Sequence, residues 1–279
     1  MHIALVCPDL TGHLNPMLTL AGELGSRGHR ISMAVTPVSE AKVRKAGFEY
    51  LPVGEPEHRE GTAAASLKLL SELKGLSALR LTGQLLGKSA ATLLRDLPPA
   101  FAAVGVEAVV VDQVSPSAAS VADVMGLPYV IACNALALNQ EPTVPPAVLP
   151  WRYRTGLLSR LRNRLGNAIL SRAGKPIYDL VNEYRTKHNF PPATLGGDEA
   201  SGLVQLAQQP AFFDFPRQGL PSHFHYTGPW HRPERDAELP FPWEKLDGRP
   251  LIYASMGTLQ NGLQHVFRAI AEAPRGMNV

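Results

Sequence analysis

Cysteine is almost absent from this chain of 279 residues, which contains two. Cys7 and Cys133 both stand in or beside apolar runs, where free thiols pack as small hydrophobic groups, so a disulfide framework is excluded. Apolar runs long enough for a membrane span, about 20 residues, are also missing. The N-terminus lacks the positively charged segment of a secretory signal peptide, and we therefore expect a cytoplasmic protein.

The sequence also has no large excess of positive or negative charge, and no metal-binding pattern. The formal net charge is +3, from 27 Lys and Arg against 24 Asp and Glu, with no domain-wide concentration of basic residues, so nucleic acid is not an expected partner. His223, His225 and His231 have no cysteine or clustered carboxylate near them in the sequence, and no metal site is predicted. The hydrophobic fraction of 45% is typical of a globular protein with a buried core.

What the sequence does contain is an alternation of strand and helix patterns. Apolar runs predict strands at 2–7, 30–36, 49–52, 107–112 and 129–133, with shorter strands near 202–207 and 223–227. Helical spacing predicts helices from about 14 to 25, 38 to 46, 63 to 97, 117 to 125 and 153 to 188. This alternation predicts an α/β fold with a doubly wound, parallel, Rossmann-like sheet.

The chain changes character after residue 227. Before that point, residues 139–150 hold four prolines and are expected to form a loop on the substrate side. From 228 to 250, a stretch rich in Pro, Trp and charge without a sustained period predicts a linker between domains. A strand at 251–255, a turn and a helix around 263–271 then predict the start of another domain.

The most informative stretch is Thr11-Gly12-His13-Leu14-Asn15-Pro16, between the first strand and the first helix. Asn15 suits the N-cap and Pro16 the first helical position, so His13 is expected just before the helix. There the positive end of the helix dipole favours a neutral imidazole that can accept a proton as a general base. The loop holds one glycine, Gly12, instead of the G-x-G-x-x-G of a dinucleotide fold. A purely structural loop histidine is the alternative.

Asp112 ends the apolar strand at 107–112. We expect it on the same rim as His13, because the carboxyl ends of parallel strands meet at one edge of a sheet. A carboxylate bonded to the second ring nitrogen would fix the tautomer and stabilise an imidazolium. Asp112 can also serve as the N-cap of the following turn, and the sequence leaves both interpretations open.

A basic amphipathic pattern runs from Trp151 to Lys175. This range holds seven Lys and Arg and no acidic residue, while one helical face carries Leu157, Leu158, Leu161, Leu165 and Ile169. Such a helix can lie on an anionic membrane. A helix of this kind more often packs on its own domain with a basic face in water, and the membrane contact is the alternative.

Several motifs, taken in their order along the chain, resemble the UDP-dependent glycosyltransferases of family 1. These enzymes have the GT-B fold of two Rossmann domains. The motifs are the stretch at 11–16, the strand-ending Asp112, Tyr226-Thr227-Gly228-Pro229, and the run from Leu251 to Gly262. The closest similarity is to the bacterial branch that includes macrolide and zeaxanthin glucosyltransferases.

The resemblance implies roles for individual residues. His13 would deprotonate a hydroxyl of the acceptor, Asp112 would orient it, and the sugar would be transferred with inversion from a UDP-sugar, expected to be UDP-glucose. This co-substrate takes the place of a cofactor. Residues implied to lie near the donor are Gly12, Ser255, Gly257 and Thr258, where backbone N–H groups beside a helix start suit a diphosphate. Without the resemblance, Ser255 to Thr258 would be an ordinary turn.

The resemblance also implies the organisation of the chain and its partners. It implies an acceptor-binding domain at 1–227, a linker at 228–250 and an incomplete donor domain at 251–279, so the chain alone is expected to be inactive. Expected acceptors are small lipophilic molecules such as a carotenoid, a macrolide or a polyphenol. Further expected contacts are a membrane surface through 151–175 and self-association or a donor-domain partner through 251–279. The alternatives are a non-catalytic module that binds an acceptor or partner, and the acceptor subunit of a split enzyme.

Overall fold

The structure is a computed structural model that describes residues 1–55, 69–73, 75–194, 202–231, 241–258 and 261–278. Contacts within the chain group it into two units, which we describe separately. Unit 1 consists of Met1–His58 and Gly83–Trp230, and unit 2 of Arg59–Thr82 and His231–Val279. The functional division into domains that the sequence suggests stays a prediction.

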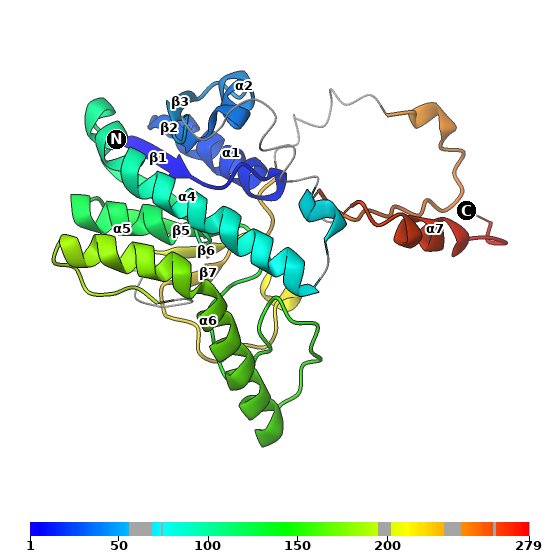
Figure 1. Cartoon of the computed structure of the whole chain (residues 1–279). Helices are drawn as coiled ribbons and strands as arrows, with labels where there is room; N and C mark the ends of the chain where they lie inside the picture. The colour runs from blue at the N-terminus through cyan, green and yellow to red at the C-terminus, as the bar shows by residue number, and fades with distance from the viewer. Residues whose placement is uncertain (56–68, 74, 195–201, 232–240, 259–260, 279) are drawn as a thin grey trace. The chain divides into compact units, whose positions relative to one another are not determined.

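Unit 1 is built on a seven-stranded sheet in which all pairs are parallel, with the order β3-β2-β1-β4-β5-β6-β7 (Figure 1). The strands are β1 (His2–Val6), β2 (Arg30–Val35), β3 (Glu49–Pro52), β4 (Ala108–Asp112), β5 (Tyr129–Cys133), β6 (Gln205–Ala207) and β7 (Phe224–Tyr226). The α/β fold with a parallel sheet, predicted from the alternation of patterns, is confirmed.

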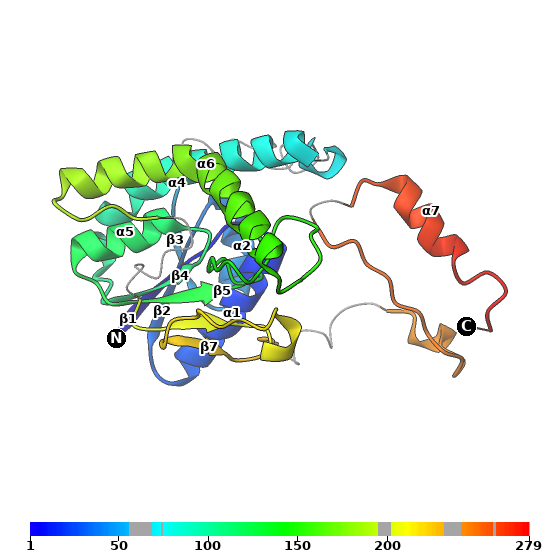
Figure 2. The same cartoon turned by 90° about the horizontal axis from the view of Figure 1, so that it is seen from below.

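Helices cover both faces of this sheet (Figure 2). They are α1 (Thr11–Ser26), α2 (Glu40–Lys45), α4 (Gly75–Val104), α5 (Pro116–Met125) and α6 (Leu157–Lys187). Successive strand residues point to opposite faces. Leu5 and Val110 therefore pack with α1 and α2, while Val6 and Val111 pack with α4 and α5. The two core layers hold the strand ends firmly in place.

The strand order reverses between β1 and β4. From β1 the sheet continues through β2 to β3 in one direction, whereas β4 continues through β5 to β7 in the other. The register pairs Val6 with Val111, so the carboxyl ends of β1 and β4 lie side by side. Open α/β sheets bind ligands at such a point of reversal, where the connections after the strands diverge.

α1 begins one turn earlier than the sequence suggests. Leu10 is its N-cap, and the Leu10 carbonyl accepts hydrogen bonds from the N–H groups of His13 (2.9 Å) and Leu14 (2.8 Å). The prediction that Asn15 caps the helix and Pro16 opens it is wrong, because Pro16 is buried inside α1. The buried face of the helix already starts at Leu14, which leaves the preceding residues to form the first turn. His13 thus lies in that turn rather than before it.

The helix predicted at 63–97 differs from the observed α4 at its C-terminal end. Its predicted start lies outside the described residues. The observed helix continues through Pro98 and Pro99 to Val104. Proline disfavours a helix interior, but Leu97 and Phe101 are completely buried against the sheet. Tertiary packing therefore outweighs the local signal.

In unit 2 the structure contains the helix α7 (Gln264–Glu272). The prediction of a strand at Leu251–Ser255 is wrong, since these residues have no regular structure and are exposed. A strand needs a neighbour to pair its backbone N–H and C=O groups, and the described part of unit 2 contains no other strand. No described helix of the chain is both long enough and apolar enough to cross a membrane.

Candidate active site

His13 and Asp112 are in direct contact at the point where the sheet order reverses. Nδ1 of His13 lies 2.7 Å from Oδ2 of Asp112. The imidazole side chain is 16% exposed and the carboxylate is completely buried. β1 and the first turn of α1 position the histidine, and the last residue of β4 supplies the carboxylate. The expected juxtaposition of the two residues is therefore confirmed.

The hydrogen bond determines which imidazole nitrogen is available. An ionised carboxylate can only accept, so Nδ1 carries the hydrogen and Nε2 of the neutral ring has a free lone pair. In the described part of the chain, no group is hydrogen-bonded to Nε2. The pair can accept a proton from a neighbouring hydroxyl.

Asp112 is held by two further hydrogen bonds. The side-chain amide of Asn134, just after β5, donates to Oδ2 over 2.7 Å, and the backbone N–H of Val114 donates to Oδ1 over 3.0 Å. The side-chain amide of Gln208 donates from Nε2 to the backbone carbonyl of Asn134 over 2.6 Å. Residues from the ends of β1, β4 and β5 thus converge on one carboxylate.

A cavity of about 200 Å³ opens beside Asp112. The carboxyl end of the sheet, α5 and α6 line it, with Gln113, Ser120, Tyr178 and Arg185 among its polar groups. Pockets for drug-sized ligands are usually about 300 to 1,000 Å³. The cavity can therefore hold a small group, but not a whole macrolide or carotenoid.

No family model matches the chain, but individual proteins do. Zeaxanthin glucosyltransferase of Pantoea ananas is 31% identical over 272 residues, covering 98% of this chain and 63% of the relative. Among solved structures, spinosyn forosaminyltransferase has a TM-score of 0.56 at 20% identity, over 98% of this chain and 62% of the other, so the two share a fold. The chain is thus similar in sequence to glycosyltransferases, and its fold matches the N-terminal part of GT-B enzymes.

The chain is also similar to a second curated transferase. Demethyllactenocin mycarosyltransferase of Streptomyces fradiae is 27% identical over 296 residues, covering 98% of this chain and 56% of the relative. The chain spans less than two thirds of the length of these curated relatives. In glycosyltransferase terms, the fold of unit 1 corresponds to the N-terminal part of the GT-B architecture.

The residues implied to contact the sugar donor fall in both units. Gly12 immediately precedes His13 in the first turn of α1, and a Cβ added there would meet no atom within 4 Å. Ser255, Gly257 and Thr258 belong to unit 2. Gly257 has a φ of +68° and donates its N–H to Oγ of Ser255 over 3.2 Å, so this segment forms a tight turn without a flanking strand. Their contact with a donor stays a prediction.

Neither Cys7 nor Cys133 is suited to act as a nucleophile at this site. Burial raises the pKa of the Cys133 thiol to about 12 and that of Cys7 well above its ordinary value. A thiol attacks only as a thiolate. Both therefore act as core residues, as the sequence predicts.

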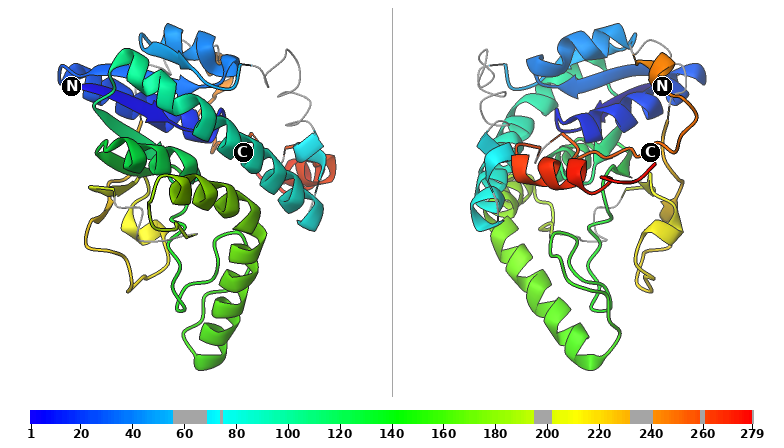
Figure 3. Two further views of the ribbon diagram at one scale, coloured as in Figure 1. Left: turned by 60° about the vertical axis from the view of Figure 1, so that its left-hand side comes forward. Right: turned by 90° about the vertical axis from the view of Figure 1, so that its right-hand side faces the viewer.

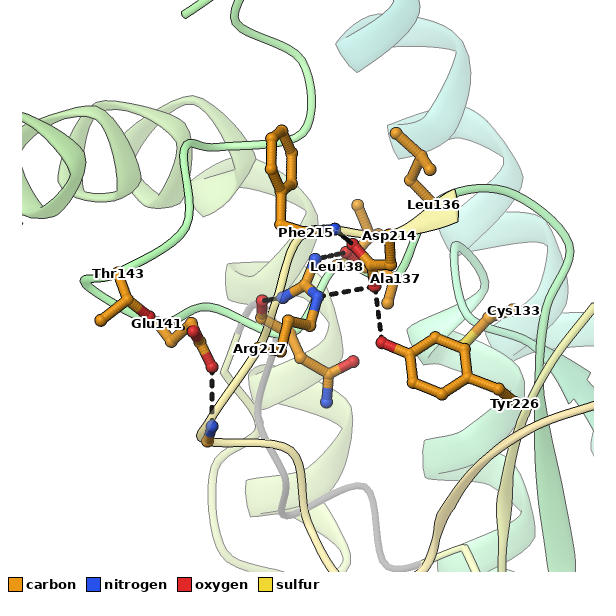
Figure 4. A network of polar contacts seen from close by, with 12 residues as sticks. Cys133, Leu136, Ala137, Leu138, Glu141, Thr143, Asp214, Phe215, Arg217 and Tyr226 are labelled. Atoms are coloured by element: carbon orange, nitrogen blue, oxygen red, sulfur yellow. Dashed lines mark hydrogen bonds and ion pairs between the residues drawn. The ribbon is translucent and has the colours of Figure 1, made fainter. Parts of the chain in front are cut away.

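A buried polar network fixes the loop that follows β5 (Figure 4). Asp214 and Arg217 form a buried ion pair of 2.7 Å, and Arg217 also donates to the carbonyls of Asn139 (2.7 Å) and Ala137 (2.9 Å). Tyr226 donates its hydroxyl to Asp214 over 2.9 Å. Burial, together with this hydrogen bond, raises the pKa of Tyr226. The network ties the residues after Asn134 to β7.

Glu141 adds a second attachment for the same loop. Its carboxylate accepts hydrogen bonds from the backbone N–H groups of Gln218 (3.1 Å) and Gly219 (2.7 Å), and from the hydroxyl of Thr143. Of the residues in this network, the sequence singled out only Tyr226, through the stretch at 226–229, and it did not predict Asn134. Asn134 carried a readable signal, because it directly follows the buried strand β5. Asp214, Arg217 and Glu141 lie in irregular segments and have no such signal.

Proposed function

We propose that this chain is the acceptor-binding part of an inverting glycosyltransferase. It would transfer a sugar, glucose by analogy with the Pantoea relative, from a UDP-sugar to a hydroxyl of a lipophilic small molecule. The relatives support this acceptor class, since their names give zeaxanthin and demethyllactenocin as the compounds concerned. The protein is proposed to work in the cytoplasm.

In the proposed reaction, the acceptor hydroxyl lies next to Nε2 of His13. Nε2 takes the hydroxyl proton while the acceptor oxygen forms a bond to the anomeric carbon of the sugar. The bond from that carbon to the diphosphate breaks on the opposite side, UDP leaves with the electron pair, and the anomeric configuration is inverted. Asp112 stabilises the imidazolium that results, and a general base of this kind contributes roughly 10² to 10⁴-fold in rate.

The observation that carries this proposal is the 2.7 Å contact between Nδ1 of His13 and Oδ2 of Asp112. The carboxylate is buried and two other groups hold it in place, so it fixes the tautomer and orientation of the ring, as a general base requires. The exposed part of the imidazole faces away from the protein core, where an acceptor can approach.

The donor site is proposed to draw on Gly12 and on Ser255, Gly257 and Thr258 of unit 2. Because the chain spans 63% of the Pantoea relative, we expect little transfer by the chain alone. Two other assignments follow if this one fails. The chain is then a non-catalytic module that holds an acceptor, or one subunit of an enzyme whose donor half is a separate protein.

The test uses the chain joined to the part of the Pantoea zeaxanthin glucosyltransferase that it does not cover. Transfer of labelled glucose from UDP-glucose to zeaxanthin is measured for this fusion and for His13→Ala. We expect kcat to fall at least about a hundredfold with KM for UDP-glucose nearly unchanged. The control is His225→Ala, which alters an exposed histidine of β7.

The same assay separates the alternatives. Equal transfer by His13→Ala and the unmodified fusion would contradict the role of His13. Zeaxanthin binding without any transfer by the fusion would favour the binding module. Transfer that appears when the 279-residue chain is mixed with a separately produced donor half would favour the split enzyme.

A further inference from the structure

The first half of α6 carries an apolar face that the described part of the chain leaves uncovered. We call it the outer face of α6, and its residues, which are 55 to 84% exposed, are Leu157, Leu158, Leu161, Leu165 and Ile169. Their spacing places them on one side of the helix. Figures 1 and 3 show this half of α6 extending beyond the sheet of unit 1.

The opposite side of the same helical segment is packed against the protein. Asn163 and Gly166 are buried, and Asn163 donates its side-chain amide to the carbonyl of Pro142 over 3.0 Å. A Cβ at Gly166 would lie 2.6 Å from the ring of Trp151, so this ring rests directly on the helix backbone. The segment is therefore held in place on this side, and because this side packs against the protein, the leucines on the other side face outward. Burying an apolar face of this size would be favourable.

Positive charge accompanies the outer face. Arg160 and Arg164 border it, Arg172 lies on it, and all three are exposed. None of them takes part in an ion pair within the described ranges. From residue 151 to 178 the sequence contains no Asp or Glu. The surface thus combines a leucine stripe with uncompensated arginines.

We propose that the outer face of α6 docks on an anionic lipid surface. The helix would lie in the plane of the interface, with its leucines among the acyl chains and its arginines at the lipid phosphates. Charge complementarity argues for this occupant over a second copy of the chain, because two such faces in contact would bring their arginines together. This inference does not depend on the proposed sugar transfer.

The test measures binding of the 279-residue chain to vesicles by flotation. One set contains phosphatidylglycerol and phosphatidylcholine in equal amounts, and the other contains phosphatidylcholine alone. We expect binding to the anionic vesicles that weakens with salt and is weak on neutral ones. The combined variant Arg160→Gln, Arg164→Gln, Arg172→Gln should lower the partition coefficient about a hundredfold, at roughly fivefold for each charge.

Matched variants separate the surface from general charge and hydrophobicity. Leu158→Gln, Leu161→Gln and Leu165→Gln together should abolish binding, and glutamine preserves helix propensity. Leu203→Gln changes another exposed leucine of unit 1 and should bind normally. The charge control is Arg27→Gln, Arg44→Gln, Lys45→Gln, which removes three charges elsewhere. Circular dichroism confirms that each variant is folded.

Three results would overturn the proposal. The first is absence of binding to anionic vesicles, and the second is a loss of binding in the charge control equal to that in the α6 variants. The third is a dimer in sedimentation analysis that the leucine variant converts to a monomer without vesicle binding, which would assign the outer face to a second copy.

Discussion

Asn134 donates a hydrogen bond of 2.7 Å to Oδ2 of Asp112, the same oxygen that faces Nδ1 of His13. The amide therefore acts on the imidazole through the carboxylate. It restricts rotation of the carboxylate, so that Oδ2 stays directed at the imidazole. Asn134 is a positioning residue, and its contribution can be measured without any assay of sugar transfer.

The first prediction concerns the coupling between Asn134 and Asp112. Asn134→Ala and Asp112→Ala should each lower the free energy of unfolding by about 1 to 3 kcal/mol, because each leaves a buried polar partner unsatisfied. Urea denaturation of both single variants and the double variant should give a coupling energy of about 0.5 to 3 kcal/mol. Pairing Asp112→Ala with Glu23→Ala, at the far end of α1, should show additivity. Additive effects for Asn134 and Asp112 as well would contradict the contact.

The second prediction concerns the tautomer of His13. Nitrogen NMR of the labelled chain should show hydrogen on Nδ1 and none on Nε2 of the neutral ring, because the carboxylate can only accept. Asp112→Asn places an amide donor opposite Nδ1 and should move the hydrogen to Nε2. Asp179→Asn, which alters an exposed carboxylate of α6, should leave the spectrum of His13 unchanged. A wild-type ring protonated on Nε2 would rule out the proposed base.

The third prediction concerns the buried pair of Asp214 and Arg217. Arg217→Met leaves the carboxylate of Asp214 buried without its cation and should lower the free energy of unfolding by about 3 to 5 kcal/mol. Arg27→Met breaks an exposed pair with Glu23 and should cost less than about 1 kcal/mol. Urea denaturation compares the two. Similar losses for both variants would mean that the pair is accessible to water.

The fourth prediction concerns the thiols. Burial raises the pKa of Cys133 from 9.0 to about 12, so iodoacetamide at pH 8.5 should modify the native protein much more slowly than the urea-unfolded chain. Between pH 9 and about 12 the folded state keeps a proton that the unfolded state releases, and stability should therefore fall as pH rises through this window. Cys7→Ala isolates the response of Cys133. Rapid labelling of native Cys7→Ala would contradict the buried position.

The contact between His13 and Asp112 could be predicted from the sequence, because the prediction required only a parallel sheet and the ends of two of its strands. Asn134 satisfies the same criterion, but an amide does not titrate, and a search for acid and base groups passes over it. The network around Arg217 depends on how two irregular segments fold over each other. No periodicity of the sequence encodes such a contact.

Where local signals misled, tertiary context explains the outcome. Asn15 and Pro16 have the chemistry of a helix start, but packing of Leu14 against the core sets the start of α1 earlier. The apolar residues at Leu251–Ser255 have the composition of a parallel strand, but composition cannot supply the neighbouring strands that would pair with it. The amphipathic pattern at 151–175 correctly gave the helix, but not which of its sides faces the protein.

The pairing of β1 with β4 also has a consequence for how the protein is made. His13 and Asp112 are 99 positions apart in the sequence, and contacts of such long range form slowly because a large loop must close first. A nascent chain that has emerged through β3 already contains its histidine, but it has neither the carboxylate nor the amide that orient it. Completion of the site thus coincides with docking of the second half of the sheet, and reactivity of the imidazole would report that late event during synthesis.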